Sequence, residues 1–389
     1  MKKLIAVSVA LALVAGSAFA EITWSGLVET SVTLVRDFDE DNLMGIRPGG
    51  AVRLQAAGTR EGAIGTFGML ARVQAAPAAG GTMNGHVWWE PAGPIFRFGI
   101  GTELGGFVDT IGRQGYFRAV PGIYMHLGGW SGTVGGAIHH NRAFMGNDGA
   151  GLSARLLPMG DMLQIGVHVP YPTAATRTYR IFAGTAASNG IRGSVRVDLD
   201  VGRIGFGYAA YSALDGTDFP AGVLGTAAVP AHRDEHNFFG FFHTGMVAGL
   251  GLDVGVRFGL NTEDDTDNRL DAGVGVNFGL NDDVDIRFRG SFGMILGDGS
   301  DWFGPQIGIE VMPSITFGDM RFCFNAGLGI DLPGSETNRD PVIHFIVNPQ
   351  LRVNLGAPSF GVGFQLRGRS YDGETDIAWG IPIGFAFSF

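Results

Sequence analysis

Arginines that alternate with apolar residues are the most chemically distinctive feature of this sequence. Arg287 lies between two apolar residues in the segment from Val284 to Met294, and Arg289 follows two positions later. A guanidinium group is always charged and presents five N–H donors, so arginines on one face attract anions and bind water. This pattern predicts a charged surface along which ions pass. The residues placed on such a surface are Arg53, Arg72, Arg97, Arg287, Arg289, Arg367 and Arg369.

Residue clusters that could support catalysis or bind a metal are sparse. His232 and His236 are four residues apart, a spacing that would put two metal ligands on one face of a helix. Pro230 precedes them and the region reads as the end of a loop, so we expect solvated side chains, with a metal or acid–base site as the alternative. His139 and His140 are adjacent and would lie on opposite faces of a strand. We therefore predict that the protein is not an enzyme and holds no cofactor or metal.

The overall charge excludes some partners. Charged residues make up 16% of the chain, against about 25% in typical soluble domains, and the formal net charge is -10. Acidic residues concentrate in turn-rich links at 37–41, 263–267 and 298–301, which read as solvated loops. A divalent-cation site there is the alternative, although the links lack the EF-hand pattern. We expect no nucleic-acid partner.

Alternating segments of β-strand character must position the arginines. In 270–280 and 284–294, apolar side chains fall on even numbers, while Asp271, Asn277, Asp285, Arg287 and Arg289 fall on odd numbers. Each strand therefore has an apolar face and a polar face. A soluble β-sandwich would show the same alternation, so periodicity alone leaves both architectures open.

The segment near the carboxy terminus has the same two-faced pattern and points to a membrane. Its large apolar residues alternate with glycine, proline, alanine and serine. The pattern resembles the carboxy-terminal signal of bacterial outer-membrane proteins, which the barrel-assembly machinery recognises. This resemblance implies a strand that faces outer-membrane lipid. The residues of the predicted assembly signal are Trp379, Ile381, Ile383, Phe385, Phe387 and Phe389.

The first twenty residues look like a cleavable secretory signal. A basic start, Met1 to Lys3, precedes an apolar stretch from Leu4 to Ala15 and a small-x-small site that ends at Ala20. We expect cleavage between Ala20 and Glu21. The predicted organisation is a signal peptide at 1–20 and one outer-membrane β-barrel at 21–389.

Composition and link lengths predict the kind of barrel. No run of about eighteen apolar residues follows the signal, so spanning helices are not expected and a closed barrel remains. Short turns, such as 281–283, alternate with longer links, such as 170–190, which is typical of up-and-down transmembrane barrels. Weak elements near 81–90 and 119–129 leave an even strand number of about 16 to 20.

An all-β antiparallel barrel that opens directly on a strand at Ile22 and ends in phenylalanine resembles the general diffusion porins of Gram-negative bacteria. The resemblance implies that the third long link, Leu104 to Arg118, folds into the lumen, and that the protein forms a trimer. The link is shorter than is usual in that family, and an ordinary external loop is the alternative. The resemblance implies a constriction in which Glu103 and Asp109 are opposed by Arg53, Arg72 and Arg97. The link departs from the family pattern in that it also contributes Arg113 and Arg118 to the predicted constriction.

These observations predict a water-filled channel for passive diffusion of small hydrophilic solutes or ions. Inward arginines outnumber inward acids, so we expect a weak preference for anions. Two alternatives remain. One is a surface adhesin or structural barrel that uses its long external loops, and the other is a channel for hydrophobic substrates.

Overall fold

A computed structural model describes ten segments of the chain. They are residues 21–36, 45–76, 80–93, 95–102, 150–170, 191–213, 233–260, 268–297, 303–335 and 340–389. The described residues include no helix long and apolar enough to cross a membrane. The predicted signal peptide at 1–20 and the weak element at 119–129 lie outside these segments.

Twenty strands account for most of the described residues, and long β-strands follow from the alternating patterns noted above. Their bounds are β1 (Glu21–Arg36), β2 (Gly45–Gly62), β3 (Gly65–Ala76), β4 (Gly80–Glu90), β5 (Phe96–Thr102), β6 (Ala150–Leu156), β7 (Pro158–Asp161), β8 (Leu163–Pro170), β9 (Arg192–Leu199), β10 (Gly202–Ala213), β11 (Arg233–His243), β12 (Leu250–Leu260), β13 (Asn268–Gly279), β14 (Val284–Leu296), β15 (Phe303–Phe317), β16 (Met320–Pro333), β17 (Val342–Asn354), β18 (Pro358–Gly363), β19 (Gln365–Tyr371) and β20 (Glu374–Ser388).

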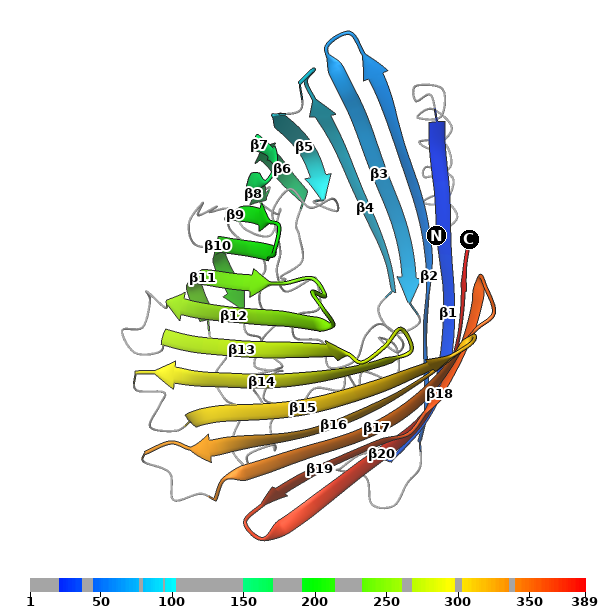
Figure 1. The fold of residues 1–389 in the computed structure, drawn as a ribbon, viewed down its shortest axis with the longest axis vertical. Coiled ribbons are helices and arrows are strands. Elements are labelled where there is room, and N and C mark those ends of the chain that lie inside the picture. Colours follow the sequence, from blue (N-terminus) through cyan, green and yellow to red (C-terminus); the bar gives the residue numbers. More distant parts are fainter. Residues whose placement is uncertain are drawn as a thin grey trace.

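The strands form one closed antiparallel barrel. Each strand pairs with the next along the chain, except that β7 is a short strand in the link between β6 and β8 and lies outside the sheet. β18 and β19 together occupy one position between β17 and β20, because the strand is interrupted at Phe364. β1 pairs with β20, which closes an 18-stranded barrel over the described residues, and Figure 1 shows the strands following one another around it. The expected barrel is confirmed, with a strand number inside the predicted range.

The seam of the barrel is the pairing of β1 with β20. Val28 lies opposite Phe387 and Leu34 lies opposite Ile381. Beyond the last paired residue, Gly26 N–H donates to the Phe389 carbonyl oxygen (2.8 Å) and Phe389 N–H donates to the Gly26 carbonyl oxygen (3.1 Å). The Phe389 ring covers Gly26 so closely that a Cβ atom there would lie 2.1 Å from the ring. The apolar segment at 379–389 therefore forms the closing strand, with its ring seated on a glycine.

The barrel wall has the reverse burial pattern of a soluble protein: its polar side chains are buried and its large apolar side chains are exposed. Large apolar side chains such as Ile309 (58% exposed) and Val87 (55%) lie on the surface, whereas Arg257 and Asn348 are each 1% exposed. Side chains crowd together on the concave side of a closed sheet and spread apart on the convex side. The buried polar set is therefore the inner face, and the exposed apolar set is the outer face. This arrangement suits hydrocarbon outside, where each mid-membrane arginine would cost about 2 to 4 kcal/mol.

Tight turns gather at one end of the barrel, which we call the short-turn end. Gly318 and Gly356 adopt φ angles of 59° and 85° there, a conformation that favours glycine. The opposite end carries the links at 37–44, 103–149, 171–190 and 214–232, together with the tight turn at Asp372 and Gly373. The links at the short-turn end are 63–64, 91–95, 157–162, 200–201, 244–249, 280–283, 318–319 and 355–357.

Candidate functional site

Arg53 and Arg72 lie side by side on the inner face of β2 and β3. Arg53 is opposite Gln74 in the strand register, and Arg72 is opposite Gln55. Arg53 Nε donates to Gln74 Oε1 (3.2 Å), and Arg72 donates to Gln55 Oε1 through Nε (3.1 Å) and Nη2 (2.8 Å). Each amide holds one guanidinium group in place on the inner wall, and a neutral amide does not cancel its charge.

The positive charge of Arg97 on β5 is compensated by a carboxylate in direct contact. Its Nε and Nη2 lie 2.6 and 2.5 Å from Glu90 Oε2, and its guanidinium carbon lies 4.2 Å from the centre of the Trp88 ring. The Trp88 ring in turn covers Gly68 of β3, where a Cβ atom would lie 2.0 Å from the ring. A charge-assisted ion pair and a cation–π contact therefore hold Arg97 in one place.

The arginine wall continues from Arg97 around the barrel. Arg155 on β6 lies directly opposite Arg97 in the strand register. Further on, Asp198 on β9 is shared by Arg196 (3.0 Å) and Arg203 (2.6 Å). This part of the inner face thus combines four arginines with two carboxylates, those of Glu90 and Asp198.

A buried polar row accompanies these charges. Ser153 on β6 and His168 on β8 are opposite each other, and Ser153 Oγ lies 2.8 Å from His168 Nδ1. Arg192 on β9 is the next residue in the row. All three side chains are buried, so this section of wall is polar throughout.

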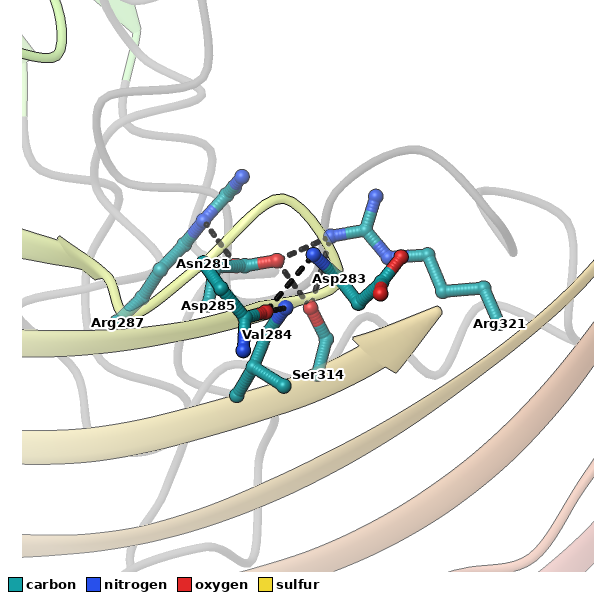
Figure 2. A network of polar contacts seen from close by, with 7 residues as sticks. All are labelled: Asn281, Asp283, Val284, Asp285, Arg287, Ser314 and Arg321. Carbon is teal, nitrogen blue, oxygen red and sulfur yellow. Dashed lines mark hydrogen bonds and ion pairs between the residues drawn. The ribbon is translucent and has the colours of Figure 1, made fainter. Parts of the chain in front are cut away.

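On the far side of the barrel, Asp285 organises a polar network at the short-turn end. Its carboxylate accepts hydrogen bonds from Ser314 Oγ on β15 and from Arg321 Nη2 on β16 (2.8 Å), and it lies 3.4 Å from Arg287 Nε (Figure 2). The neighbouring turn is fixed by Asn281, whose Oδ1 accepts from the backbone N–H groups of Asp283 (2.9 Å) and Val284 (2.8 Å). The network therefore ties three adjacent strands together just inside the rim.

Deeper in the wall, Arg289 on β14 lies directly opposite Glu310 on β15. Glu310 is 3% exposed, and Arg257 on β12 is buried on the same inner face. Opposite charges at directly facing positions stabilise a pair of antiparallel strands.

The remaining predicted site residues are described less fully. Arg367 and Arg369 lie on β19 opposite Ile346 and His344, and only their backbone is described. The predicted constriction residues Glu103, Asp109, Arg113 and Arg118 lie outside the described residues. The role of the arginines in a conducting pore and the constriction itself stay predictions.

Several inner-face aromatic residues were missed by the sequence analysis. Trp88 could have been found, because it lies two positions from the polar Glu90 and therefore shares its face. Phe239 and Phe241 look like outer-face residues from their type, yet they cover Gly207 and Gly205 on the inner face. Only the facing glycines, which come from a different strand, explain how the inner wall accommodates the two rings.

The histidine pair weighed as a metal site does not have helical geometry. His236 belongs to strand β11, and its Nδ1 lies 2.7 Å from the Tyr208 hydroxyl oxygen, while His232 lies outside the described residues. Within the described segments, no three His, Cys, Asp or Glu residues gather in a group that could hold a metal ion.

Comparisons with known proteins concern the fold. No family model matches the chain, and no curated protein matches its sequence. Among solved structures, the chain is similar to variants of a porin from Rhodopseudomonas blastica: one is 13% identical with a TM-score of 0.48, and a triple mutant is 12% identical with a TM-score of 0.44. Both alignments cover 95% of this chain and 100% of the porin. The strand pairing itself defines the fold, an 18-stranded antiparallel barrel with an apolar outer face and an arginine-rich inner face, which agrees with the porin-like barrel expected from the sequence.

Proposed function

We propose that the chain forms a water-filled channel through which small hydrophilic solutes or ions diffuse passively across the outer membrane. The observation that carries the proposal is the reversed burial of the wall: apolar side chains outside, and arginines, carboxylates and amides inside. A barrel of about eighteen strands has a lumen too wide for wall side chains alone to fill. A polar inner face around such a lumen supports the passage of water and ions.

The inner face also supports a weak preference for anions. Among the described residues, arginines on it outnumber acids: Arg53 and Arg72 donate to glutamine amides, while Asp198 and Asp285 each serve two arginines. A lumen with excess positive charge raises the local concentration of anions. The preference should weaken at high ionic strength, because salt screens the wall charges.

The proposal includes the route to the membrane and the assembly. Residues 1–20 are removed after export between Ala20 and Glu21, and the barrel-assembly machinery recognises the strand that ends in Phe387 and Phe389. The mature barrel assembles as a homotrimer. The segment from Leu104 to Arg118 enters the lumen, with Glu103, Asp109, Arg113 and Arg118 opposite Arg53, Arg72 and Arg97.

Conductance of the purified protein in a planar lipid bilayer tests the channel. Stepwise, ohmic current increments are expected, and heat-denatured protein from the same preparation is the control. Bilayers that stay silent with folded protein would reject the channel and favour an adhesin or structural barrel. In a salt gradient, a reversal potential on the cation-selective side would contradict the anion preference alone.

The constriction has its own test. Asp109→Asn and Arg53→Ala should each shift the reversal potential, in opposite directions, because they remove charges of opposite sign. Removal of residues 215–232 from a different external link is the matched control and should leave the conductance step unchanged. Because Arg53 lies on the wall in either case, an unchanged reversal potential in Asp109→Asn would mean that Leu104 to Arg118 is an ordinary external loop.

A further inference from the structure

Two arginines face each other on the inner wall near the short-turn end. Arg321 on β16 and Arg352 on β17 are directly opposite in the strand register. Directly opposed residues in an antiparallel pair have Cβ atoms about 4.5 to 5.5 Å apart, and like charges at such positions destabilise the sheet. Both side chains share the inner face with the buried Cys323 and Gln350, so neither guanidinium is turned toward lipid.

The described carboxylates compensate only part of this charge. Asp285 accepts from Arg321 and is shared with Arg287, so one carboxylate serves two arginines. Arg352 makes no hydrogen bond or ion pair with any described residue. Asp283 and Asp319 are exposed on the adjacent turns, where solvent screens their charge. Asp285 therefore compensates only part of the positive charge of Arg287, Arg321 and the opposed Arg352.

The two strands beyond Arg352 offer it no polar partner at the facing positions. The residue opposite Arg352 on β18 is Gly361, and the residue opposite Gly361 on β20 is Gly384. Neither glycine has a side chain that could pair with the guanidinium. Next to it on β17, the Gln350 side chain is 2% exposed and its Oε1 has no hydrogen-bond partner. A carboxamide can offer N–H donors to an anion once its two ends are exchanged.

An unused donor is a second indication of a ligand. The Nε atom of Arg321 is buried and has no hydrogen-bond partner. A buried donor without a partner is costly, and charged donors cost more than neutral ones. Guanidinium groups present their donors in a planar fork that matches the oxygens of phosphate and carboxylate groups.

We propose that Arg321 and Arg352, with Gln350 beside them, form a binding site for a small oxyanion of the inorganic phosphate class in the lumen wall. The anion accepts from both guanidinium groups, which removes the repulsion between them. Because the site lies on the inner face, its ligand is a free solute and not a lipid headgroup. The proposal deepens the proposed channel function and rests on it for the path by which the anion arrives.

Binding of inorganic phosphate to the folded protein in detergent micelles tests the site directly. Isothermal titration calorimetry should show saturable binding that is about tenfold weaker in Arg352→Gln, as expected for the loss of one charge-assisted contact. Arg352→Lys should bind with intermediate affinity, because the charge remains and the fork is lost. Arg60→Gln is the matched control: Arg60 is an exposed arginine near the same end of the barrel but on the outer face. Heat-modifiable mobility on gels verifies that each variant is folded.

Block of the chloride current by phosphate tests the binding site and the channel function separately. Phosphate added on the short-turn side should reduce the chloride current at lower concentrations than phosphate added on the other side, and Arg352→Gln should remove this difference. The site is rejected if wild-type protein binds no phosphate, or if Arg352→Gln binds it as tightly as wild type or Arg60→Gln. Phosphate binding in micelles together with silent bilayers would instead reject the channel and leave the site standing.

Discussion

Two pairs of opposed arginines on the inner wall differ in how neighbouring groups compensate their positive charge. Arg97 and Arg155 face each other on β5 and β6, and Arg321 and Arg352 face each other on β16 and β17. In the first pair, Arg97 has a carboxylate partner close in sequence, Glu90, and an aromatic ring beneath it. In the second pair, Arg321 relies on Asp285, two strands away, and Arg287 shares that carboxylate.

The difference shows that counting wall arginines is not enough to describe the electrostatics of the lumen. The potential that an ion meets depends on how many of these charges have a partner within a few ångströms. A carboxylate and an aromatic ring hold Arg97, whereas Arg352 makes no hydrogen bond or ion pair with a described residue. Four substitutions test this difference in charge compensation between the two arginine pairs.

The largest effect is expected for Gly68→Ala, which displaces the Trp88 ring that packs against Arg97 of the first pair. The new Cβ atom would lie 2.0 Å from the Trp88 ring, so the ring must move away from Arg97. Forcing an extra methyl group into a packed site costs about 1 to 3 kcal/mol. The midpoint of guanidinium-induced unfolding should fall accordingly. Gly85→Ala on the neighbouring strand β4 is the matched control, because a Cβ atom there meets no heavy atom within 4 Å; equal loss in both variants would contradict the assignment.

The next effect is expected for Asp285→Asn. The amide keeps the size of the side chain but leaves Arg287 and Arg321 without their shared carboxylate. These groups are partly exposed, so we expect a loss of about 1 to 2 kcal/mol in the free energy of unfolding, less than for a fully buried pair. The anion preference in a salt gradient should rise at the same time. A drop in stability with no change in selectivity would mean that Asp285 acts on the structure only.

Glu90→Gln should remove the carboxylate that compensates the positive charge of Arg97 in the first pair. Loss of the carboxylate leaves two opposed arginines near Trp88, so anion permeability relative to cation permeability should increase. Reversal potentials in a potassium chloride gradient measure this ratio. Arg352→Gln should change the same ratio in the opposite direction, and a shift of equal sign in the two variants would exclude a simple additive effect of wall charge.

The smallest effect is expected for Trp88→Leu, which removes the cation–π contact and keeps an apolar side chain. An exposed contact of this kind contributes about 0.5 to 1 kcal/mol. The unfolding midpoint should fall slightly while the Arg97–Glu90 ion pair keeps the selectivity near that of wild type. A large change in selectivity would show that Trp88, and not Glu90, holds Arg97 in place.

Alternation along each strand was enough to predict the fold class. The even and odd positions of 270–280 and 284–294 predicted the faces of β13 and β14, because the period of a strand is two and lipid tolerates arginine poorly. The strand number could only be bounded, since Gly80–Glu90 is rich in glycine and polar residues and shows little alternation, yet it forms β4.

What the sequence could not predict depends on contacts between strands. The seating of Phe239 and Phe241 on the inner face depends on glycines of β10. The compensation of Arg321 depends on the register of β14, β15 and β16, which brings Asp285 and Ser314 beside it. Neither relation is visible within a single segment, because register is a property of paired strands.

The seam between Gly26 and Phe389 has a consequence for the order of folding. Every other neighbouring pair in the barrel joins strands that are close along the chain, but this contact joins the first strand to the last. Bringing two such distant segments together costs the most chain entropy of any step in the barrel. Until it happens, β1 and β20 are two open edges with unpaired N–H and C=O groups, in contact with whatever surrounds the half-formed sheet. Closure of this seam is therefore expected to limit the folding rate, and Gly26→Ala, which blocks the Phe389 ring, should slow assembly more than it changes the conductance of barrels that have closed.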